Sequence, residues 1–573
     1  MIGVVAATAS GRTAATALSA AWPGEIRVFT GEKASDDLRE AWRICESVVS
    51  FLAVGATVRV LAPLLGHKTT DPAVVCVDEG MRFAVALLGG HHGANELATR
   101  VSGVLGCAPV VTTASDAVGK TPLDTLGADL GFTVENPWLL AQVGAAVLSG
   151  VPYEVHDHGG WPLPAMPGDP RPDGSGPEVL IRIDDRIATP AYSPELIYRP
   201  PSLIVGVGSA RGVSAHEVGK LIDAALDGLS PLSVRCVATV DVKADEEGIL
   251  QAAAERGWEV VTYPAQVLAT VEVPNPSQVV RAEVGTPSVA EAAALHAARS
   301  QGRSGDLVVP KRKSANATVA VARLSPKGRL AIIGLGPGAR DLLTPRAVHS
   351  LQRASVVVGL DQYVDQIRDL LRPGTRVIES GLGQEEERAR SAVREAERGH
   401  AVALIGSGDA GVYAMASPAL EFASETIDVD GIPGITAAVA ASNLLGAPLG
   451  HDHAYISLSD LHTPWEVIER RVRAVAEGDF TVCFYNPRSK ARDWQLPAAL
   501  AILAGHRPSD TPVGFVRNAT RSDQAMTLTT LGEADPAWVN QVDMFTVVLV
   551  GSSRSRTIAG RFVTPRGYQW SSS

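Results

Sequence analysis

The stretch Gly406-Ser407-Gly408-Asp409-Ala410-Gly411-Val412-Tyr413 decides how the C-terminal part of this chain folds. It follows the apolar run Ala401-Val402-Ala403-Leu404-Ile405, which predicts a buried strand. An acidic, glycine-lined loop is therefore expected at the carboxyl end of that strand. Glycines let backbone approach a ligand closely, while Asp409 supplies a carboxylate and Tyr413 an aromatic face. Taken alone, the loop is compatible with a structural turn as well as with a ligand site.

Strands and helices are predicted to alternate on both sides of this loop. Apolar runs at 330–333, 355–358 and 376–378 are separated by helical stretches. Apolar strands bounded by helices indicate a mainly parallel sheet that is buried on both faces. Later apolar runs at 480–485 and 545–550 predict a second α/β lobe after about residue 450.

Length and composition narrow the class of protein. A chain of 573 residues is too long for one core, and about 150 residues per domain suggests about four units. The 46% hydrophobic and 20% charged residues are typical of globular protein, and the net charge of −11 argues against a nucleic-acid partner. Five scattered cysteines without a CxxC pair favour a reduced, cytoplasmic setting and no metal site. No apolar run reaches the ~18 residues of a membrane span, and no basic leader precedes the first apolar run.

The chain divides by composition into four regions. Residues 1–150 and 201–323 each alternate strands with helical stretches, which predicts two α/β domains. Between them, residues 151–200 form a linker or middle region. Its proline- and glycine-rich part, 161–174, disfavours a regular element and predicts a linker or a surface loop. A polar joint at 325–328 then precedes the C-terminal region.

The first loop of the C-terminal region, Gly334-Leu335-Gly336-Pro337-Gly338-Ala339, fits the pattern G-x-G-x-x-A. A nicotinamide dinucleotide site is therefore one alternative, and a plain tight turn is another. Pro337 lacks the N–H donor that a pyrophosphate would use. The following helix is predicted to begin only at Thr344-Pro345, too far along to direct its N-terminus at a phosphate.

Five further segments of the C-terminal region have distinctive sequences. They are Gly431-Ile432-Pro433-Gly434-Ile435-Thr436, Gly446-Ala447-Pro448-Leu449-Gly450-His451-Asp452, Ser459-Asp460-Leu461, Tyr485-Asn486-Pro487-Arg488-Ser489 and Thr564-Pro565-Arg566-Gly567-Tyr568. With the two glycine loops, they make residues 329–568 resemble precorrin-3B C17-methyltransferase, a tetrapyrrole methylase of cobalamin biosynthesis.

The resemblance implies a class III methyltransferase fold of two α/β lobes, about 329–448 and 449–568, with S-adenosylmethionine bound between them. It also implies methylation of precorrin-3B, or its cobalt form, at C17 with ring contraction to precorrin-4. A homodimer is expected, because tetrapyrrole methylases are commonly dimeric. Carried over by position, the cofactor-binding residues are Pro337, Ser407, Gly408, Asp409, Val412, Thr436, Ala437, Asn486 and Thr529.

Ring contraction needs an acid–base group, for which a histidine or an acid suits neutral pH. His451 and Asp452, with His453 behind them, are the candidates; hydrogen bonding at the lobe junction is the alternative role. Arg488, Arg517 and Arg521 are candidates for pairing with the acidic substituents of the substrate. Surface or structural roles are the alternative for each arginine.

The N-terminal half carries its own motifs. A predicted strand at 83–88 runs into Gly89-Gly90-His91-His92-Gly93-Ala94-Asn95, and a second strand at 109–111 ends in hydroxyls and Asp116. The paired histidines lack a third ligand at helical spacing, so a ligand-binding loop is favoured over zinc. With 238–246, 286–291 and 317–320, these segments resemble cobalt-precorrin-5A hydrolase, which opens a macrocycle lactone and releases acetaldehyde.

The resemblance makes Gly206-Val207-Gly208-Ser209-Ala210-Arg211-Gly212 a false match to a dinucleotide loop. His91, Lys243 and Glu246 are the candidates for activating water or for stabilising the oxyanion. The loop around His91 departs from the family pattern S-G-H-x-G-G-A-N, because it is one residue shorter and lacks the serine. Two hypotheses follow: a bifunctional enzyme, or a methyltransferase whose N-terminal half only binds tetrapyrrole or stabilises the protein.

Overall fold

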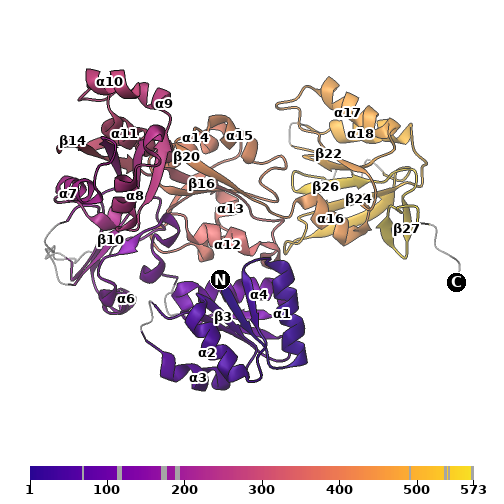
Figure 1. Ribbon diagram of the computed structural model, residues 1–573. Coiled ribbons are helices and arrows are strands. Elements are labelled where there is room, and N and C mark those ends of the chain that lie inside the picture. Colours follow the sequence, from indigo (N-terminus) through magenta and orange to yellow (C-terminus); the bar gives the residue numbers. More distant parts are fainter. Residues whose placement is uncertain are drawn as a thin grey trace. The chain divides into compact units, whose positions relative to one another are not determined.

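The computed structural model describes residues 1–66, 70–112, 119–168, 177–187, 194–489, 492–534, 539 and 542–568, except for the side chains of His91 and His92. The chain forms two compact units, Met1–Pro326 with Arg372–Gly374, and Lys327–Leu371 with Thr375–Ser573. Each contains strands and helices in alternation, so the predicted α/β class is confirmed (Figure 1).

The first sheet of unit 1 has the order β2-β1-β3-β4-β5-β6 and is parallel except for the β4–β5 pair. Helices α1 and α4 pack on one face and α2 and α3 on the other, around two separate clusters of buried side chains. The elements are β1 (Ile2–Val5), α1 (Ala9–Ala21), β2 (Ile26–Phe29), α2 (Ala34–Ile44), β3 (Ser47–Ser50), α3 (Val54–Leu61), β4 (Ala73–Val77), β5 (Phe83–Leu88), the π-turn η2 (Gly90–Ala94), α4 (Asn95–Leu105) and β6 (Ala108–Val110).

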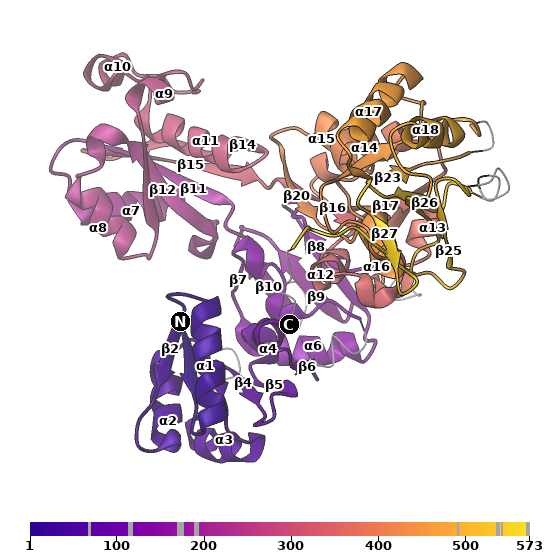
Figure 2. The ribbon, with the colours of Figure 1, turned by 90° about the vertical axis from the view of Figure 1, so that its right-hand side faces the viewer.

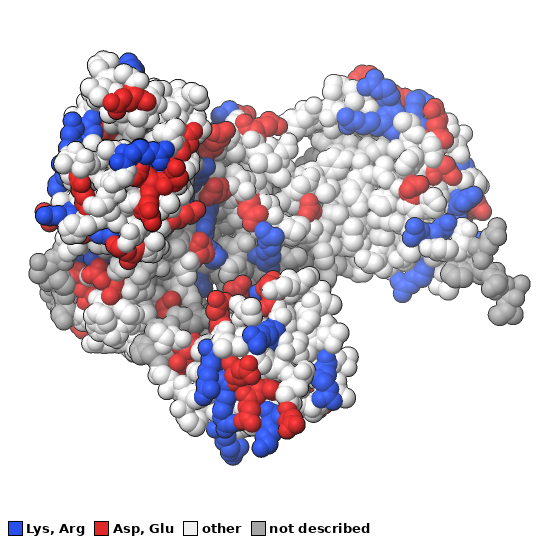
Figure 3. All heavy atoms as spheres, in the orientation of Figure 1, with Lys and Arg blue, Asp and Glu red and all other residues white. Residues whose placement is uncertain are grey.

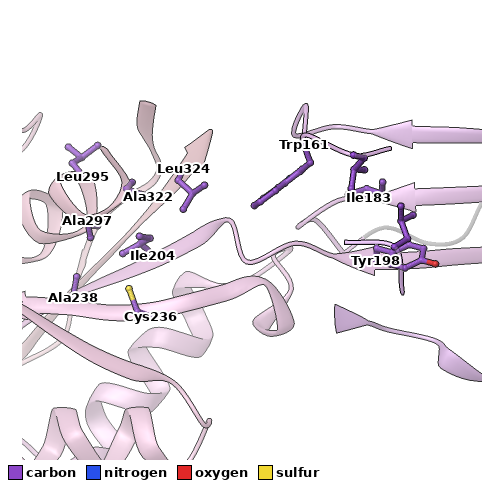
Figure 4. Close-up of a cluster of buried hydrophobic side chains, with 14 of the residues drawn as sticks. Trp161, Ile183, Tyr198, Ile204, Cys236, Ala238, Leu295, Ala297, Ala322 and Leu324 are labelled. Carbon is purple, nitrogen blue, oxygen red and sulfur yellow. The ribbon is translucent and has the colours of Figure 1, made fainter. Parts of the chain in front are cut away.

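A second sheet, of order β7-β10-β9-β8, occupies the region that follows. The predicted absence of a regular element is confirmed for the described part of 161–174, since 161–168 form no helix or strand. The predicted surface position was wrong, because Trp161, Leu163 and Ala165 are buried. Trp161 belongs to the same buried cluster as Tyr198 and Leu324 (Figure 4). Proline density indicates an irregular backbone but not its exposure. The elements are β7 (Thr133–Val134), α6 (Leu140–Leu148), β8 (Tyr153–Asp157), β9 (Val179–Ile183) and β10 (Glu195–Arg199).

The third sheet of unit 1 has the order β13-β12-β11-β15-β14. Helices α7 and α8 cover one face and α11 the other (Figure 2). Gly206 and Gly208 lie within β11 itself, so they form no dinucleotide loop. The elements are β11 (Leu203–Ser209), α7 (Ala215–Ala225), β12 (Val234–Val240), α8 (Glu247–Ala254), β13 (Glu259–Tyr263), α9 (Ala265–Ala269), α10 (Gln278–Val284), α11 (Val289–Gln301), β14 (Ser304–Lys313) and β15 (Ala317–Ser325).

Unit 2 begins with a sheet of order β18-β17-β19-β16-β20, in which every pair is parallel, as predicted. Helices α14 and α15 cover one face and α12 and α13 the other. Thr344 caps α12 and Pro345 opens it, which confirms the predicted start of this helix. The elements are β16 (Gly328–Gly334), α12 (Pro345–Gln352), β17 (Val356–Leu360), α13 (Asp361–Val364), β18 (Arg376–Ser380), α14 (Glu385–Glu397), β19 (Ala401–Gly406), α15 (Ala416–Phe422) and β20 (Ile427–Ile432).

The second lobe of unit 2 is a mixed sheet of order β22-β23-β26-β24-β25. Helices α17 and α18 pack on one face and α16 on the other. A small sheet, β21-β28-β27, joins the two ends of this lobe in sequence. The elements are α16 (Ala437–Leu445), β21 (Gly446–Ala447), β22 (His453–Ser457), α17 (Trp465–Glu477), β23 (Thr481–Tyr485), α18 (Gln495–Ala504), β24 (Pro512–Arg517), β25 (Ala525–Thr530), β26 (Thr546–Val550), β27 (Arg556–Ile558) and β28 (Arg561–Val563).

Three further features concern the charges on the surface, the cysteines and the helices. On the face in Figure 3, the described Lys and Arg side chains are interspersed with Asp and Glu. All five cysteines are buried and unpaired. Among the described residues, the helices are too short or too polar to cross a membrane.

A glycine in β11 gives the first testable prediction. A Cβ atom added to Gly206 would lie 1.9 Å from the carbonyl oxygen of Ala290 in α11. Gly206→Ala should therefore force α11 away from the sheet and lower the free energy of unfolding by about 1–3 kcal/mol. Calorimetric unfolding measures the change. Gly103→Ala in α4 is the control, since no atom lies within 4 Å of its added Cβ; equal destabilisation by both changes would contradict this account.

Candidate active site

The two glycine loops of unit 2 meet at the carboxyl edge of the first sheet. Gly336 and Gly408 exchange backbone hydrogen bonds of 3.0 and 2.8 Å across the ends of β16 and β19. Both residues have positive φ, at 74° and 69°, a conformation that glycine adopts without steric cost. The sequence of the loops thus imposes a backbone-to-backbone contact between them.

A third glycine closes this contact. A Cβ atom on Gly434, in the loop after β20, would lie 2.1 Å from the carbonyl oxygen of Gly408 and 2.7 Å from that of Gly334. Any larger residue there would separate the loops. We call the packing of Gly434 against Gly408 and against Gly334, the last residue of β16, the glycine contact.

Asp409 holds the glycine contact together. Its Oδ1 accepts a hydrogen bond from the N–H of Gly411 at 2.8 Å, and its Oδ2 accepts one from the N–H of Gly434 at 3.1 Å. Hydrogen bonds from backbone amides to a carboxylate are strong and directional. The carboxylate therefore organises the loops in addition to any contact with a ligand.

Thr436 and Tyr485 connect the loop after β20 to the second lobe. The Thr436 hydroxyl lies 2.5 Å from the Tyr485 hydroxyl, which also accepts a hydrogen bond of 2.9 Å from the N–H of Ala438. Burial raises the pKa of Tyr485 far above its usual value, so the phenol stays protonated. Tyr485, at the end of β23, thereby satisfies an amide in the first turn of α16.

Tyr413 makes a second connection between the lobes. Its hydroxyl donates to the carbonyl of Tyr455 at 2.9 Å and accepts from the N–H of Ser457 at 3.2 Å. The Tyr413 and Tyr485 rings lie 5.2 Å apart between centroids, and Tyr413 is 53% exposed. The ring can therefore meet a ligand while its hydroxyl anchors the Asp409 loop to β22.

The carboxyl ends of β22, β23 and β24 share one edge of the second sheet. There the Asn486 amide donates to the Ser457 hydroxyl at 3.1 Å. Asn486, Asn518 and Thr520 all have positive φ, as does Tyr413 on the facing loop. Non-glycine residues rarely adopt this conformation, and they concentrate at functional sites.

The three predicted substrate-binding arginines differ in their partners. Arg517 pairs with Asp543 at 2.8 Å and Asp523 at 3.0 Å, and these hydrogen bonds raise the pKa of its guanidinium further. Arg488 donates to the carbonyl of Val539 at 3.1 Å. Arg517 is thus engaged in ion pairs, and its predicted contact with substrate acids would require exchange of these partners.

Arg521 lies against the first loop. Its Nε donates to the carbonyl of Pro337 at 3.1 Å, and its Nη2 donates to the Ser407 hydroxyl at 3.3 Å. Next to it, Thr520 accepts a hydrogen bond of 3.2 Å from the N–H of Ala339. The structure therefore brings one predicted substrate-binding residue together with two predicted cofactor-binding residues.

The predicted acid–base residues lie elsewhere on the second lobe. His451 and Asp452 precede β22, at the end opposite Ser457, and their side chains are 42% and 79% exposed. The imidazole Nδ1 accepts a hydrogen bond from the backbone N–H of Asp452, and His453 packs on Tyr455. Their catalytic role stays a prediction. Of the remaining cofactor residues, Val412 lies in the Asp409 loop, Ala437 opens α16, and Thr529 lies in β25.

The predicted residues of the N-terminal half are only partly described. The backbone of His91 lies in η2 (Gly90–Ala94), after Gly89 with φ of 68°, but its side chain lies outside the described part, as does Asp116. Lys243 and Glu246 form a buried ion pair at 3.3 Å, and Glu246 also accepts from the N–H of Gly212 at 2.7 Å. Both ions are held in place, which suits a structural role as well as a catalytic one.

Several residues at this site were not predicted from sequence. The ring of Tyr413 was predicted to face a ligand, but the partners of its hydroxyl and of the Tyr485 hydroxyl were not, because they are distant in sequence. Tyr455 and Ser457 lie in the short strand β22, whose sequence contains no motif that indicates a functional site. Within the described residues, no group of three or more His, Cys, Asp or Glu is arranged to hold a metal ion.

Similarity to known proteins identifies the family of the C-terminal region. Residues 329–535 match the family model Tetrapyrrole (Corrin/Porphyrin) Methylases, and the chain belongs to this family. Residues 36–116 match the model Cobalamin synthesis G N-terminal, and residues 203–322 match Cobalamin synthesis G C-terminus. Both resemblances inferred from the motifs are confirmed.

Individual relatives fall within the C-terminal region. A probable cobalt-factor III C(17)-methyltransferase of Salmonella typhimurium is 46% identical over 242 residues, which are 42% of this chain and 99% of the relative. A precorrin-3B C(17)-methyltransferase of Sinorhizobium is 39% identical over 237 residues, covering 40% of this chain and 91% of the relative. The crystal structure of the methyltransferase CobJ shares 38% identity, covers 42% of this chain and 100% of its own, and has a TM-score of 0.40.

The Tyr413 hydroxyl gives the second prediction. Tyr413→Phe removes both hydrogen bonds to β22 and keeps the ring, so it should destabilise unit 2 by about 1–2 kcal/mol. Thermal unfolding measures the loss. Tyr263→Phe in unit 1, where the ring packs edge-on against His296, is the control. A Tyr413 variant as stable as the wild type would show that the hydroxyl does not anchor the loop.

Proposed function

We propose that residues 329–568 catalyse S-adenosylmethionine-dependent methylation of precorrin-3B, or its cobalt form, at C17, with ring contraction to precorrin-4. The glycine contact carries this proposal, because it joins three loops that the family resemblance assigns to the cofactor. Family membership and the named relatives support the substrate class. The proposed lobes are about 329–448 and 449–568.

The residues at this edge fit such a cofactor. The backbones of the two glycine loops contact each other at Gly336 and Gly408. The Ser407 and Thr436 hydroxyls belong to the loops that follow β19 and β20, and Tyr413 offers a half-exposed ring. When bound, S-adenosylmethionine supplies a methyl group activated by a sulfonium cation. Carbonyls, hydroxyls and a carboxylate suit this cation better than a phosphate cradle does. The proposed cofactor-binding residues remain Pro337, Ser407, Gly408, Asp409, Val412, Thr436, Ala437, Asn486 and Thr529.

The contribution of the protein to methyl transfer is positional. Reacting atoms must be held in line and within about 3–3.5 Å. Asp409 fixes the loops of the first lobe, and Tyr413 and Tyr485 tie these loops to the second. His451 and Asp452 stay the candidates for deprotonation during ring contraction, although they lie at the end of β22 opposite Ser457. Arg488, Arg517 and Arg521 are the candidates for binding the acidic substituents.

For the N-terminal half we propose hydrolysis of the cobalt-precorrin-5A lactone with release of acetaldehyde. Two matches to Cobalamin synthesis G models favour it. His91, Lys243 and Glu246 are the candidate residues, and 1–150 and 201–323 are the proposed domains on either side of the middle region 151–200. The alternative is a non-catalytic half that binds tetrapyrrole or stabilises the protein. A cytoplasmic homodimer without nucleic-acid or membrane partners completes the proposal.

The third prediction tests the cofactor. Calorimetric titration with S-adenosylhomocysteine should show binding, and Asp409→Ala should weaken it about 10-fold or more, because the change frees two amides that each contribute about 1.5–3 kcal/mol. Asp430→Ala is the matched control, since its carboxylate is 62% exposed and pairs with Arg346. Tight binding of NAD in place of S-adenosylhomocysteine would overturn the assignment.

The fourth prediction tests the hydrolase. The full chain, incubated with cobalt-precorrin-5A, should release acetaldehyde, and His91→Ala should slow the release about 100-fold if His91 is the base. Acetaldehyde is measured with alcohol dehydrogenase and NADH. A chain that methylates precorrin-3B but releases no acetaldehyde would support the non-catalytic alternative.

A further inference from the structure

Two arginines at the carboxyl edge of the first sheet have neutral partners. Arg521 donates to the Pro337 carbonyl and the Ser407 hydroxyl. Arg388 donates to the Ser380 hydroxyl at 2.8 Å and the Gly381 carbonyl at 2.8 Å. Within the described part of the chain, neither forms an ion pair with a carboxylate, whereas Arg517 has two such partners.

Arg388 is the less expected of the two. It is only 5% exposed, and its Nη1 contacts the Met415 sulfur at 3.6 Å. It also lies near the start of α14, where the helix dipole disfavours a cation. The acids of this first turn are directed elsewhere, since Glu386 pairs with Arg390 and Glu387 with Arg394. Burying a cation without a counter-charge costs several kcal/mol, so an anion bound nearby would stabilise this arrangement.

Tyr363 lies close enough to both arginines for their charges to affect its phenol. Burial raises the pKa of its phenol, while the charges of Arg521 and Arg388 and a hydrogen bond with Ser407 act in the opposite direction. Both guanidinium groups therefore act on one side chain, and Ser407 contacts that side chain as well as Arg521.

The topology explains why these groups meet. Ser380 ends β18, Tyr363 lies in α13 directly after β17, and Ser407 follows β19. These are three adjacent parallel strands, and ligands of open α/β sheets bind beyond the carboxyl ends of such strands. Arg521 approaches the same edge from the second lobe.

We propose that Arg388, Arg521, Tyr363 and Ser407 form a subsite for a carboxylate of the ligand. Guanidinium groups bind carboxylates through two parallel N–H donors, and hydroxyls add further donors. The inference rests on the proposed function, which offers two sources of this chemistry: the amino-acid carboxylate of S-adenosylmethionine, or an acetate or propionate side chain of the macrocycle.

The fifth prediction separates these sources. Arg521→Met and Arg388→Met in the full chain are compared with Arg394→Met, an exposed residue of the same helix paired with Glu387. If the cofactor supplies the carboxylate, the Kd of S-adenosylhomocysteine rises about 10-fold or more in both variants. The Kd of methylthioadenosine, which lacks the amino acid, then stays unchanged. If the macrocycle supplies it, the Kd of S-adenosylhomocysteine is unchanged and the KM for precorrin-3B rises by a similar factor.

Two further results complete the test. Unchanged Kd and KM in a folded Arg521→Met chain would overturn the subsite, and because Arg521 is only partly buried this variant should fold. Arg388 is buried, so a second variant, Arg388→Lys, keeps the charge but loses the planar donor pair. A binding defect that is weaker in Arg388→Lys than in Arg388→Met supports the subsite. Equal losses of thermal stability in the two variants, without a binding defect in either, would contradict it. A wild-type chain that binds neither S-adenosylhomocysteine nor precorrin-3B would instead contradict the proposed function.

Discussion

The site depends on the glycine contact, in which three backbone segments pack without any side chain between them. Gly334, Gly408 and Gly434 follow or end three neighbouring strands, and Cβ atoms added to Gly334 and Gly434 would lie 2.6 and 2.1 Å from the carbonyl oxygen of Gly408. The carboxylate of Asp409 then fixes the loops by accepting two amide hydrogen bonds. The rest of the site is built outward from this contact, through Tyr413 and Tyr485 to the second lobe.

Asp409 has a structural role that its sequence context does not suggest. An acid in a glycine-rich loop invites assignment as a direct ligand contact. Here both oxygens already hold backbone amides, so its first contribution is to the shape of the loop. Direct contact with a cation and organisation of the loop are compatible, because a carboxylate has about four acceptor positions.

Much of the architecture could be predicted from the sequence because apolar strands and helix caps are local patterns. The parallel first sheet and the start of α12 at Pro345 follow from such patterns. Contacts between distant segments could not be predicted in this way. Tyr413 meets Tyr455 across 42 residues, and Arg521 meets Pro337 across 184. Burial was also missed at Trp161, because the prolines around it predict an irregular backbone but say nothing about its exposure.

The Tyr413 hydroxyl also affects how the second lobe behaves toward other polypeptides. β22 is an edge strand, and an edge presents unpaired N–H and C=O groups to which a strand of another chain can add. Tyr413 occupies one such carbonyl and one such amide, at Tyr455 and Ser457. A side chain that anchors a loop thus also shields the edge from intermolecular strand pairing, and its loss would favour aggregation as well as weakening the site.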